Sequence, residues 1–133
     1  AARTALNADY TALREQITDD SAVVYRPLEW LFMEAPWYKG RVVLIGDAAH
    51  ATTPHLGQGA GMAIEDSIVL AEEITRGQSV ESEFAAFQAR RYDRCRYIVE
   101  SSVAICRSQL GTGPKVEQAA ATKAMFERVA QPI

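Results

Sequence analysis

Apolar residues recur every three or four positions over most of the chain, which is the spacing of one face of an α-helix. The pattern predicts helices over 3–17, 59–76, 79–108 and 116–129. Gly77 is expected to end the second helix and Ser79 to cap the third. The chain is therefore expected to be mostly helical.

Each predicted helix has an apolar face. The first carries Leu6, Tyr10, Leu13 and Ile17 on one stripe. The second is expected to bury Ala63, Ile64, Ser67, Ile68, Leu70, Ala71 and Ile74, with Glu65, Glu72 and Arg76 outside. The third is expected to bury Phe84, Phe87, Ile98, Val99, Val103 and Cys106.

Three short apolar stretches predict strands, over 22–25, 29–34 and 42–45. Pro27 separates the first two and favours an edge or a bend. The third stretch is a run of branched apolar residues between Gly40 and Gly46, a pattern typical of a strand buried on both faces of a parallel sheet. No second run of this quality is present, so most of that sheet is expected to lie outside this chain.

An acidic residue and a glycine-rich loop follow the third stretch. Asp47 stands at its carboxyl end, where open α/β sheets bind ligands, and its carboxylate can accept hydrogen bonds from a sugar or polyol. Gly57, Gly59 and Gly61 then allow the backbone to lie against a flat ligand. The helix expected from Gly59 would present unpaired N–H groups and a partial positive charge at the same place.

These residues resemble a known motif. Gly46-Asp-Ala-Ala-His50, then Pro54, then Gly57-Gln-Gly-Ala-Gly-Met-Ala-Ile-Glu-Asp66 is similar to the second flavin-binding motif of the class A flavoprotein aromatic hydroxylases. That family includes the 4-hydroxybenzoate and salicylate hydroxylases. Trp37 with Gly40-Arg41-Val42 resembles the residues that precede this motif in the family. Residues 25–28 resemble the sheet segment that comes before those.

The resemblance implies a fold and a division of the chain. The parent fold would be α/β, an FAD/NAD(P)-binding, Rossmann-like domain with a substrate sheet. This chain would be a mostly helical piece of it with a few short strands. Residues 1–36 would end the substrate domain, and 37–133 would form the C-terminal part of the FAD-binding domain.

The resemblance also implies a cofactor site and an activity. Asp47 would bind the ribityl hydroxyls of FAD, and the backbone of Gly57, Gln58, Gly59, Ala60, Gly61 and Met62 would run along the isoalloxazine ring. Pro54 would also belong to the cofactor site, where it would help to line the space beside the reactive edge of the ring. Pro54 and His55 are the candidates for substrate contact, and no residue is assigned a catalytic role. Many members have Asn where this chain has Gly61, a difference that bears on the branch of the family.

The implied function is hydroxylation of an aromatic substrate by an FAD-dependent monooxygenase that uses NAD(P)H and dioxygen. The family's dinucleotide fingerprint is absent upstream of Asp47, so the chain is interpreted as the C-terminal part of a longer protein. Its missing N-terminal half would be its partner, and alone it is expected to be inactive and to retain FAD weakly. The alternative is a non-catalytic helical module that keeps this fold and self-associates.

Other polar residues are interpreted structurally. His50 is expected to be a structural hydrogen-bonder and His55 not to be catalytic, and Glu65 and Asp66, adjacent on a helix, do not predict an acid/base dyad. Packing roles are expected for Trp30, Phe32 and Trp37. A solvated face with local ion pairs, rather than a cofactor-phosphate site, is expected for Arg90, Arg91, Arg94 and Arg96.

Composition narrows the possible partners. The chain of 133 residues has 14 basic and 17 acidic residues and a net charge of −3, which does not indicate nucleic acid as a partner. No apolar run approaches the roughly 18 residues of a membrane span, so a cytoplasmic protein is expected. Cys95 and Cys106 would lie about 16 Å apart along one helix, too far for a disulfide. His50 and His55 lack metal-ligand spacing.

Overall fold

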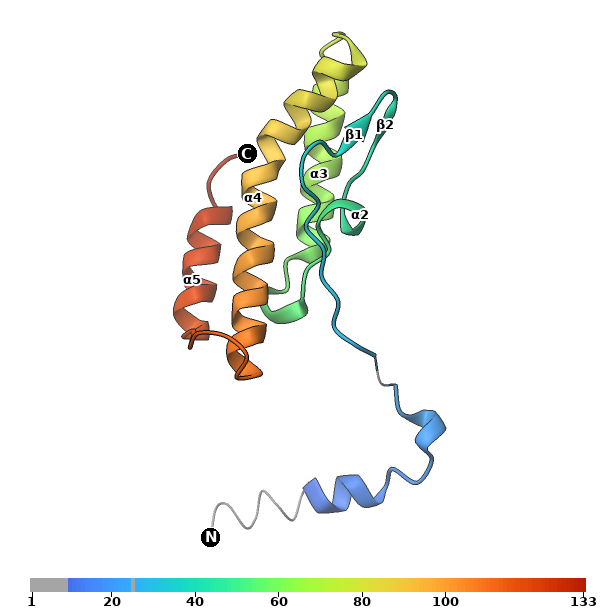
Figure 1. Cartoon of the computed structure of the whole chain (residues 1–133), viewed down its shortest axis with the longest axis vertical. Helices are drawn as coiled ribbons and strands as arrows, with labels where there is room; N and C mark the ends of the chain where they lie inside the picture. The colour runs from blue at the N-terminus through green and yellow to red at the C-terminus, as the bar shows by residue number, and fades with distance from the viewer. Residues whose placement is uncertain (1–9, 25) are drawn as a thin grey trace.

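The computed structural model describes residues 10–24 and 26–133. Three helices lie side by side, with α4 (Val80–Gln109) between α3 (Gly59–Ile74) and α5 (Gln118–Val129) (Figure 1). The shorter elements are η1 (Asp20–Ala22), β1 (Tyr38–Lys39), β2 (Val42–Val43), α2 (Asp47–His50) and η2 (Pro54–Leu56). In Figure 1 the N-terminal part of the described chain, 10–24, lies away from the three helices, whereas 31–37 passes along them.

The helices predicted from 59 onward are confirmed within a few residues. The hydroxyl oxygen of Ser79 accepts a hydrogen bond from Ser82 N at 3.3 Å, as a helix cap does. Gly77 has a φ of 69°, the left-handed conformation that ends a helix. Of the first predicted helix, 3–9 lies outside the described residues and 10–15 is helical. Its stripe is exposed, with Leu13 58% accessible.

The first two strand predictions are wrong in the part of the chain that the structure describes, whereas the third is met in part by β2. Val23 and Val24 are exposed and form no strand, and Tyr25 lies outside the described residues. The segment 29–34 is extended without a strand ladder, and Leu31 N and Met33 N donate to the carbonyls of Ala51 and Ala49 at 2.9 and 2.8 Å.

The stretch 42–45 begins as the second arm of an antiparallel hairpin, with Tyr38 opposite Val43. Val42 is 64% exposed, so the strand is not buried on both faces as predicted. A central parallel strand needs neighbouring strands on both sides. Among the described residues β1 is its only strand partner, and the short turn from Lys39 to Val42 fixes an antiparallel arrangement.

The main core lies where α3 and α4 meet the segment 33–49. It contains Trp37, Ala49, Met62, Val69, Phe87, Cys95, Ile98, Val99 and Val103. The Trp37 indole N–H donates to Met33 O at 2.9 Å, and Trp37 N donates to Gln88 Oε1 at 2.6 Å. Phe32 packs edge-on against Trp37, which confirms the packing roles of these two aromatic residues.

A second core cluster attaches α5 to the rest. It consists of Leu56 from η2, Ile105 from α4 and Met125 from α5. All the predicted inward positions of the long helix are buried except Cys106, which is half-buried. Both cysteines are free thiols, as predicted.

The buried face of α3 differs from the predicted one. The residues that it buries are Met62, Asp66, Val69 and Glu73, whereas Ile64, Ile68 and Ile74 are 62%, 53% and 50% exposed. The reason is electrostatic, because α4 presents arginines to this interface. Arg90 Nη1 lies 2.7 Å from Glu73 Oε1, and Arg91 Nε lies 2.8 Å from Asp66 Oδ1. None of the helices in the described ranges is long and apolar enough to cross a membrane.

Gly46 turns the chain from the hairpin into α2. Its φ of 57° and ψ of −141° are disfavoured for residues with a side chain. A Cβ at this position would lie 3.3 Å from the Cβ of Ala63 on α3. The turn therefore strongly favours glycine and places the start of α2 against α3.

We expect Gly46→Ala to lower the free energy of unfolding by about 2–4 kcal/mol, because it adds backbone strain and a crowded contact. Gly77→Ala is the matched control, since Gly77 also has a positive φ but nothing within 4 Å of an added Cβ. It should cost about 1 kcal/mol. Urea unfolding followed by circular dichroism measures both values, and equal losses would contradict the crowded contact.

Candidate functional site

Asp47 is the first residue of α2 and is exposed. No hydrogen bond or ion pair to its carboxylate is present within residues 10–24 and 26–133. Asp47 is therefore not part of an internal salt bridge in the described structure, and it is exposed to solvent. The carboxylate is thus available to a ligand.

The loop after α2 is anchored to α4 by two hydroxyls. Ser102 Oγ donates to Thr53 O at 2.7 Å and lies 2.8 Å from Thr53 Oγ1. Since a serine hydroxyl has one proton, the Thr53 hydroxyl donates in the second contact. Both residues are buried, so the loop is held firmly just before Pro54. Pro54 and Gly57 are exposed, and His55 is half-buried.

The first turn of α3 presents open backbone donors. The first intrahelical bond is from Met62 N to Gln58 O at 2.9 Å, and Gln58 caps the helix without a side-chain bond. In the described structure no acceptor lies on the N–H groups of Gly59, Ala60 or Gly61, as is usual for the first turn of a helix. These amides and the helix dipole favour negative charge at this end.

A second group of predicted residues is committed to the protein itself. Met62 is 1% exposed, and its carbonyl accepts from Arg91 Nη2 at 3.2 Å. Gly57 N donates to Pro54 O at 3.0 Å, with Gly57 in the left-handed region at a φ of 65°. Gln58 Nε2 donates weakly to Leu56 O at 3.4 Å. The open donors of the motif are therefore those of Gly59, Ala60 and Gly61.

Behind α2 lies a buried polar centre on Asp66, whose side chain is fully inaccessible. Asp66 Oδ2 accepts from Gly46 N at 2.8 Å and from His50 Nε2 at 2.7 Å. Asp66 Oδ1 accepts from Arg91 Nε at 2.8 Å. The structural hydrogen-bonding predicted for His50 is confirmed, and its partner is Asp66.

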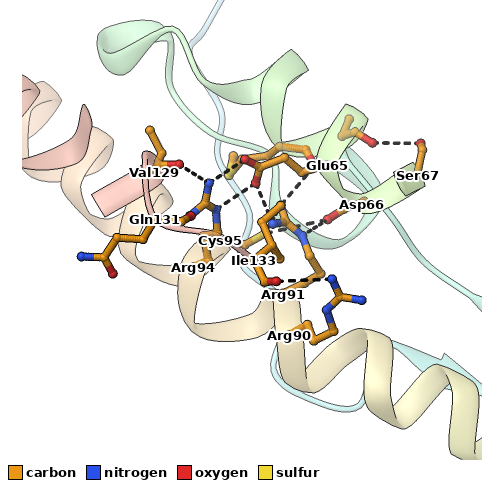
Figure 2. A network of polar contacts seen from close by, with 12 residues as sticks. Glu65, Asp66, Ser67, Arg90, Arg91, Arg94, Cys95, Val129, Gln131 and Ile133 are labelled. Atoms are coloured by element: carbon orange, nitrogen blue, oxygen red, sulfur yellow. Dashed lines mark hydrogen bonds and ion pairs between the residues drawn. The ribbon is translucent and has the colours of Figure 1, made fainter. Parts of the chain in front are cut away.

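The centre extends across the helices through Glu65 (Figure 2). Arg91 Nη1 donates to Glu65 Oε2 at 2.6 Å, and Arg94 Nη2 donates to Glu65 Oε1 at 2.7 Å. Arg94 also donates to Val129 O at 2.6 Å and Gln131 O at 3.1 Å, near the end of α5. One network therefore joins α2, α3, α4 and α5.

The prediction of a solvated arginine face is wrong for Arg91, which is fully buried, and for Arg94, whose side chain is 10% exposed. Arg96 conforms to it, pairing with Glu100 on the surface. A signal for Arg91 was present, because Phe87, Arg91 and Cys95 share one face at four-residue spacing. An arginine between two inward apolar positions must be paired when buried.

These contacts shift the pKa values of His50 and Asp66. Burial acts to lower the pKa of His50, but the hydrogen bond to Asp66 and the neighbouring Cys95 outweigh it and raise the pKa to about 9. Burial acts to raise the pKa of Asp66, yet the bonds from His50, Gly46 and Arg91 hold that pKa below its usual value. The raised pKa favours the imidazolium form of His50, paired with the Asp66 carboxylate, at neutral pH.

His50, Asp66 and Cys95 also form a compact set of potential metal ligands, with their atoms within 4.8 Å of one another. Arg91 already supplies the positive charge there, because Nε contacts Asp66 and Nη2 lies 3.4 Å from the sulfur of Cys95. A dication would face both a guanidinium and an imidazolium. The arrangement therefore favours an ion-pair centre over a metal centre.

The family model described as FAD binding domain matches residues 12–102. The chain belongs to this family of FAD-dependent monooxygenases, and its cofactor is FAD. The predicted resemblance, cofactor and mostly helical architecture with short strands are thereby confirmed. The open carboxylate of Asp47 and the open amides of α3 fit such a ligand.

Particular relatives share this segment. The chain is 44% identical over 96 residues to the Bacillus subtilis protein YetM, whose name describes an FAD-dependent monooxygenase, and it spans 26% of that protein's length. It is 45% identical over 86 residues to 2-heptyl-3-hydroxy-4(1H)-quinolone synthase of Pseudomonas aeruginosa, covering 65% of this chain and 22% of that protein.

A solved structure agrees with the fold. The crystal structure of P. aeruginosa PqsL in complex with 2-aminobenzoylacetate aligns with a TM-score of 0.60 and 26% identity. The match covers 84% of this chain and 29% of PqsL. The chain thus spans about a quarter of the length of the relatives that it matches.

The raised pKa of His50 makes stability depend on pH. The free His value is 6.5 and the folded value about 9, so the contribution is complete below pH 6.5 and is lost as the pH rises through 9. We expect the free energy of unfolding to fall by on the order of 3 kcal/mol over this window. Denaturant unfolding at a series of pH values measures it.

Two variants identify the titrating group. His50→Gln can still donate to Asp66 but does not titrate, so its stability should be flat from pH 6.5 to 9. His55→Gln should keep the wild-type slope, since His55 does not contact Asp66 in the described structure. If wild type and His50→Gln show the same slope, the imidazolium assignment is wrong.

Proposed function

We propose that this chain forms the part of an FAD site that holds the ribityl chain and the isoalloxazine ring. The observation that carries the proposal is the open pair of ligand-binding groups, the Asp47 carboxylate and the first-turn amides of α3. Gly46 lies against Ala63 on α3, so the start of α2 and the first turns of α3 are neighbours. One extended ligand can therefore contact both.

Each group has a distinct task in this proposal. The carboxylate of Asp47 accepts hydrogen bonds from ribityl hydroxyls. The N–H groups of Gly59, Ala60 and Gly61, with the helix dipole, stabilise negative charge on the pyrimidine edge of the ring. The absence of side chains at Gly59 and Gly61 lets the ring approach the backbone.

The whole protein would be a monooxygenase that hydroxylates an aromatic substrate with NAD(P)H and dioxygen. FAD, when bound, supplies the redox and oxygen-transfer chemistry. The aromatic substrate is supported by the quinolone named for one relative and the 2-aminobenzoylacetate bound to PqsL. Pro54 and His55 would line the substrate space, and we propose a cytoplasmic location.

We further propose that this chain alone is inactive and binds FAD weakly. The groups described above contact only the ribityl and ring portions of the cofactor. The adenosine diphosphate portion would bind to the remainder of the longer protein. We also propose that 1–36 belongs to the substrate domain and 37–133 to the FAD-binding domain.

We expect FAD to bind the chain with a dissociation constant of about 0.1–1 mM, because only part of the ligand is held. A ¹H–¹⁵N NMR titration should show shifts at Asp47 and at Gly59, Ala60 and Gly61. Riboflavin should shift the same amides, and adenosine diphosphate should not. Failure of FAD and riboflavin to perturb these amides would contradict the proposed site.

Asp47→Asn should weaken riboflavin binding about 10-fold, because a charge-assisted hydrogen bond is lost. Asp93→Asn is the matched control, since Asp93 is also an exposed acid but lies on α4. Its affinity should equal that of wild type. An unchanged affinity in Asp47→Asn would remove the carboxylate from the site.

A second candidate function is that of a self-associating helical module. The exposed isoleucines Ile64 and Ile68, one turn apart on α3, favour it, because exposed apolar surface promotes association. Light scattering after size exclusion should then show dimers or larger species whose size is unaffected by FAD. Ile64→Glu with Ile68→Glu should yield monomers.

Ala85→Glu with Ala89→Glu is the matched control for this variant. It adds the same charges at the same four-residue spacing on exposed positions of α4. It should leave the association unchanged. A monomeric wild-type chain at millimolar concentration would contradict this second function.

A further inference from the structure

Asp66 contacts both ends of the short helix that carries Asp47. Its Oδ2 atom accepts from Gly46 N, at the start of α2, and from His50 Nε2, at the end of α2. Asp47 itself lies between these two contacts and is exposed. One buried carboxylate thus holds α2 from behind while the helix presents its own acid outward.

The helix cannot maintain this direction alone. It has four residues, far fewer than an isolated helix needs in water. Its capping residue, Gly46, offers no side chain to cap it. The orientation of α2 is therefore fixed by the hydrogen bonds that Asp66 accepts, by the bond from Met33 N to Ala49 O, and by the packing of Ala49 in the core and of His50 against Trp37.

Arg91 in turn fixes the carboxylate of Asp66. Its Nε atom binds Oδ1 and leaves Oδ2 for the two contacts on α2. The rest of the guanidinium is occupied by Glu65, by the carbonyl of Met62 and by the sulfur of Cys95. A planar guanidinium held at several points gives the carboxylate little freedom to rotate.

We propose that Asp66 is a positioning residue of the flavin site, which sets the direction of the Asp47 carboxylate through Gly46 and His50. This inference rests on the proposed function. Charged groups buried in this way are costly, and apolar side chains of similar volume are often at least as stabilising. Their use at this place supplies an orientation that apolar packing does not specify, as a binding site requires of its supporting residues.

The test compares Asp66→Asn with wild type in two measurements on the chain. The side-chain amide has one carbonyl acceptor, which cannot serve Gly46, His50 and Arg91 together. Hydrogen exchange of the Gly46 amide, followed by NMR, should accelerate about 10-fold or more relative to the α4 amides. Riboflavin affinity should fall about 10-fold.

Glu73→Gln is the matched control. Glu73 is also a buried acid of α3 paired with an arginine of α4, but it has no contact with α2 in the described residues. It should lower the melting temperature and leave Gly46 exchange and riboflavin affinity at wild-type values. If Asp66→Asn behaves like Glu73→Gln in both measurements, Asp66 is merely structural and the inference is overturned.

A second variant tests the inference if Asp66→Asn does not fold. His50→Ala removes one contact on α2 and leaves Arg91 bonded to Asp66, and it should shift the Asp47 amide and weaken riboflavin binding. Unchanged values would overturn the inference. If wild type binds no riboflavin, the proposed function fails, while unchanged Gly46 exchange in Asp66→Asn would separately disprove the positioning of α2 by Asp66.

Discussion

The buried carboxylate of Asp66 organises the centre of this structure. It accepts hydrogen bonds from the backbone of the hairpin exit, from α2 and from α4, and it is itself part of α3. Three segments distant in the sequence, namely 46–50, α3 and α4, therefore meet at two oxygen atoms. The apolar core beside it, with Trp37, Phe87 and Ile98, supplies hydrophobic stabilisation.

This arrangement separates internal charges from those offered to a ligand. Asp66 and Glu65 are neutralised by Arg91, Arg94 and protonated His50. Asp47 and the amides of Gly59 to Gly61 have no such partners within the described chain. A carboxylate that accepts hydrogen bonds and a set of N–H donors therefore remain open on the neighbouring elements α2 and α3. A ligand that bears both hydroxyls and a polar ring edge requires this combination.

The local features of the fold could be predicted from the sequence. Ser79 begins a helix, Gly77 ends one, and the glycines after Asp47 mark the turn into α3, because each effect depends on neighbouring residues alone. Among the site residues, Asp47 and the α3 amides were predicted from the motif. Their contact with flavin stays a prediction.

The features that could not be predicted depend on distant partners. The apolar residues Ile64 and Ile68 were expected inside, yet the arginines of α4 draw the acidic side of α3 inward. The stretch 42–45 has the composition of a central strand but finds only β1 within the described residues. The sequence suggested only a pairing of Asp66 with the adjacent Glu65, whereas the hydrogen-bond partners of Asp66 lie 16 to 25 positions away.

The most direct test of the account is a crystal structure of the flavin-loaded protein. The account predicts the Asp47 carboxylate within hydrogen-bond distance of a ribityl hydroxyl and an α3 first-turn amide facing the ring, with the three contacts of Asp66 retained. A flavin seated away from this turn, or an α2 rotated so that Asp47 faces the protein interior, would contradict it.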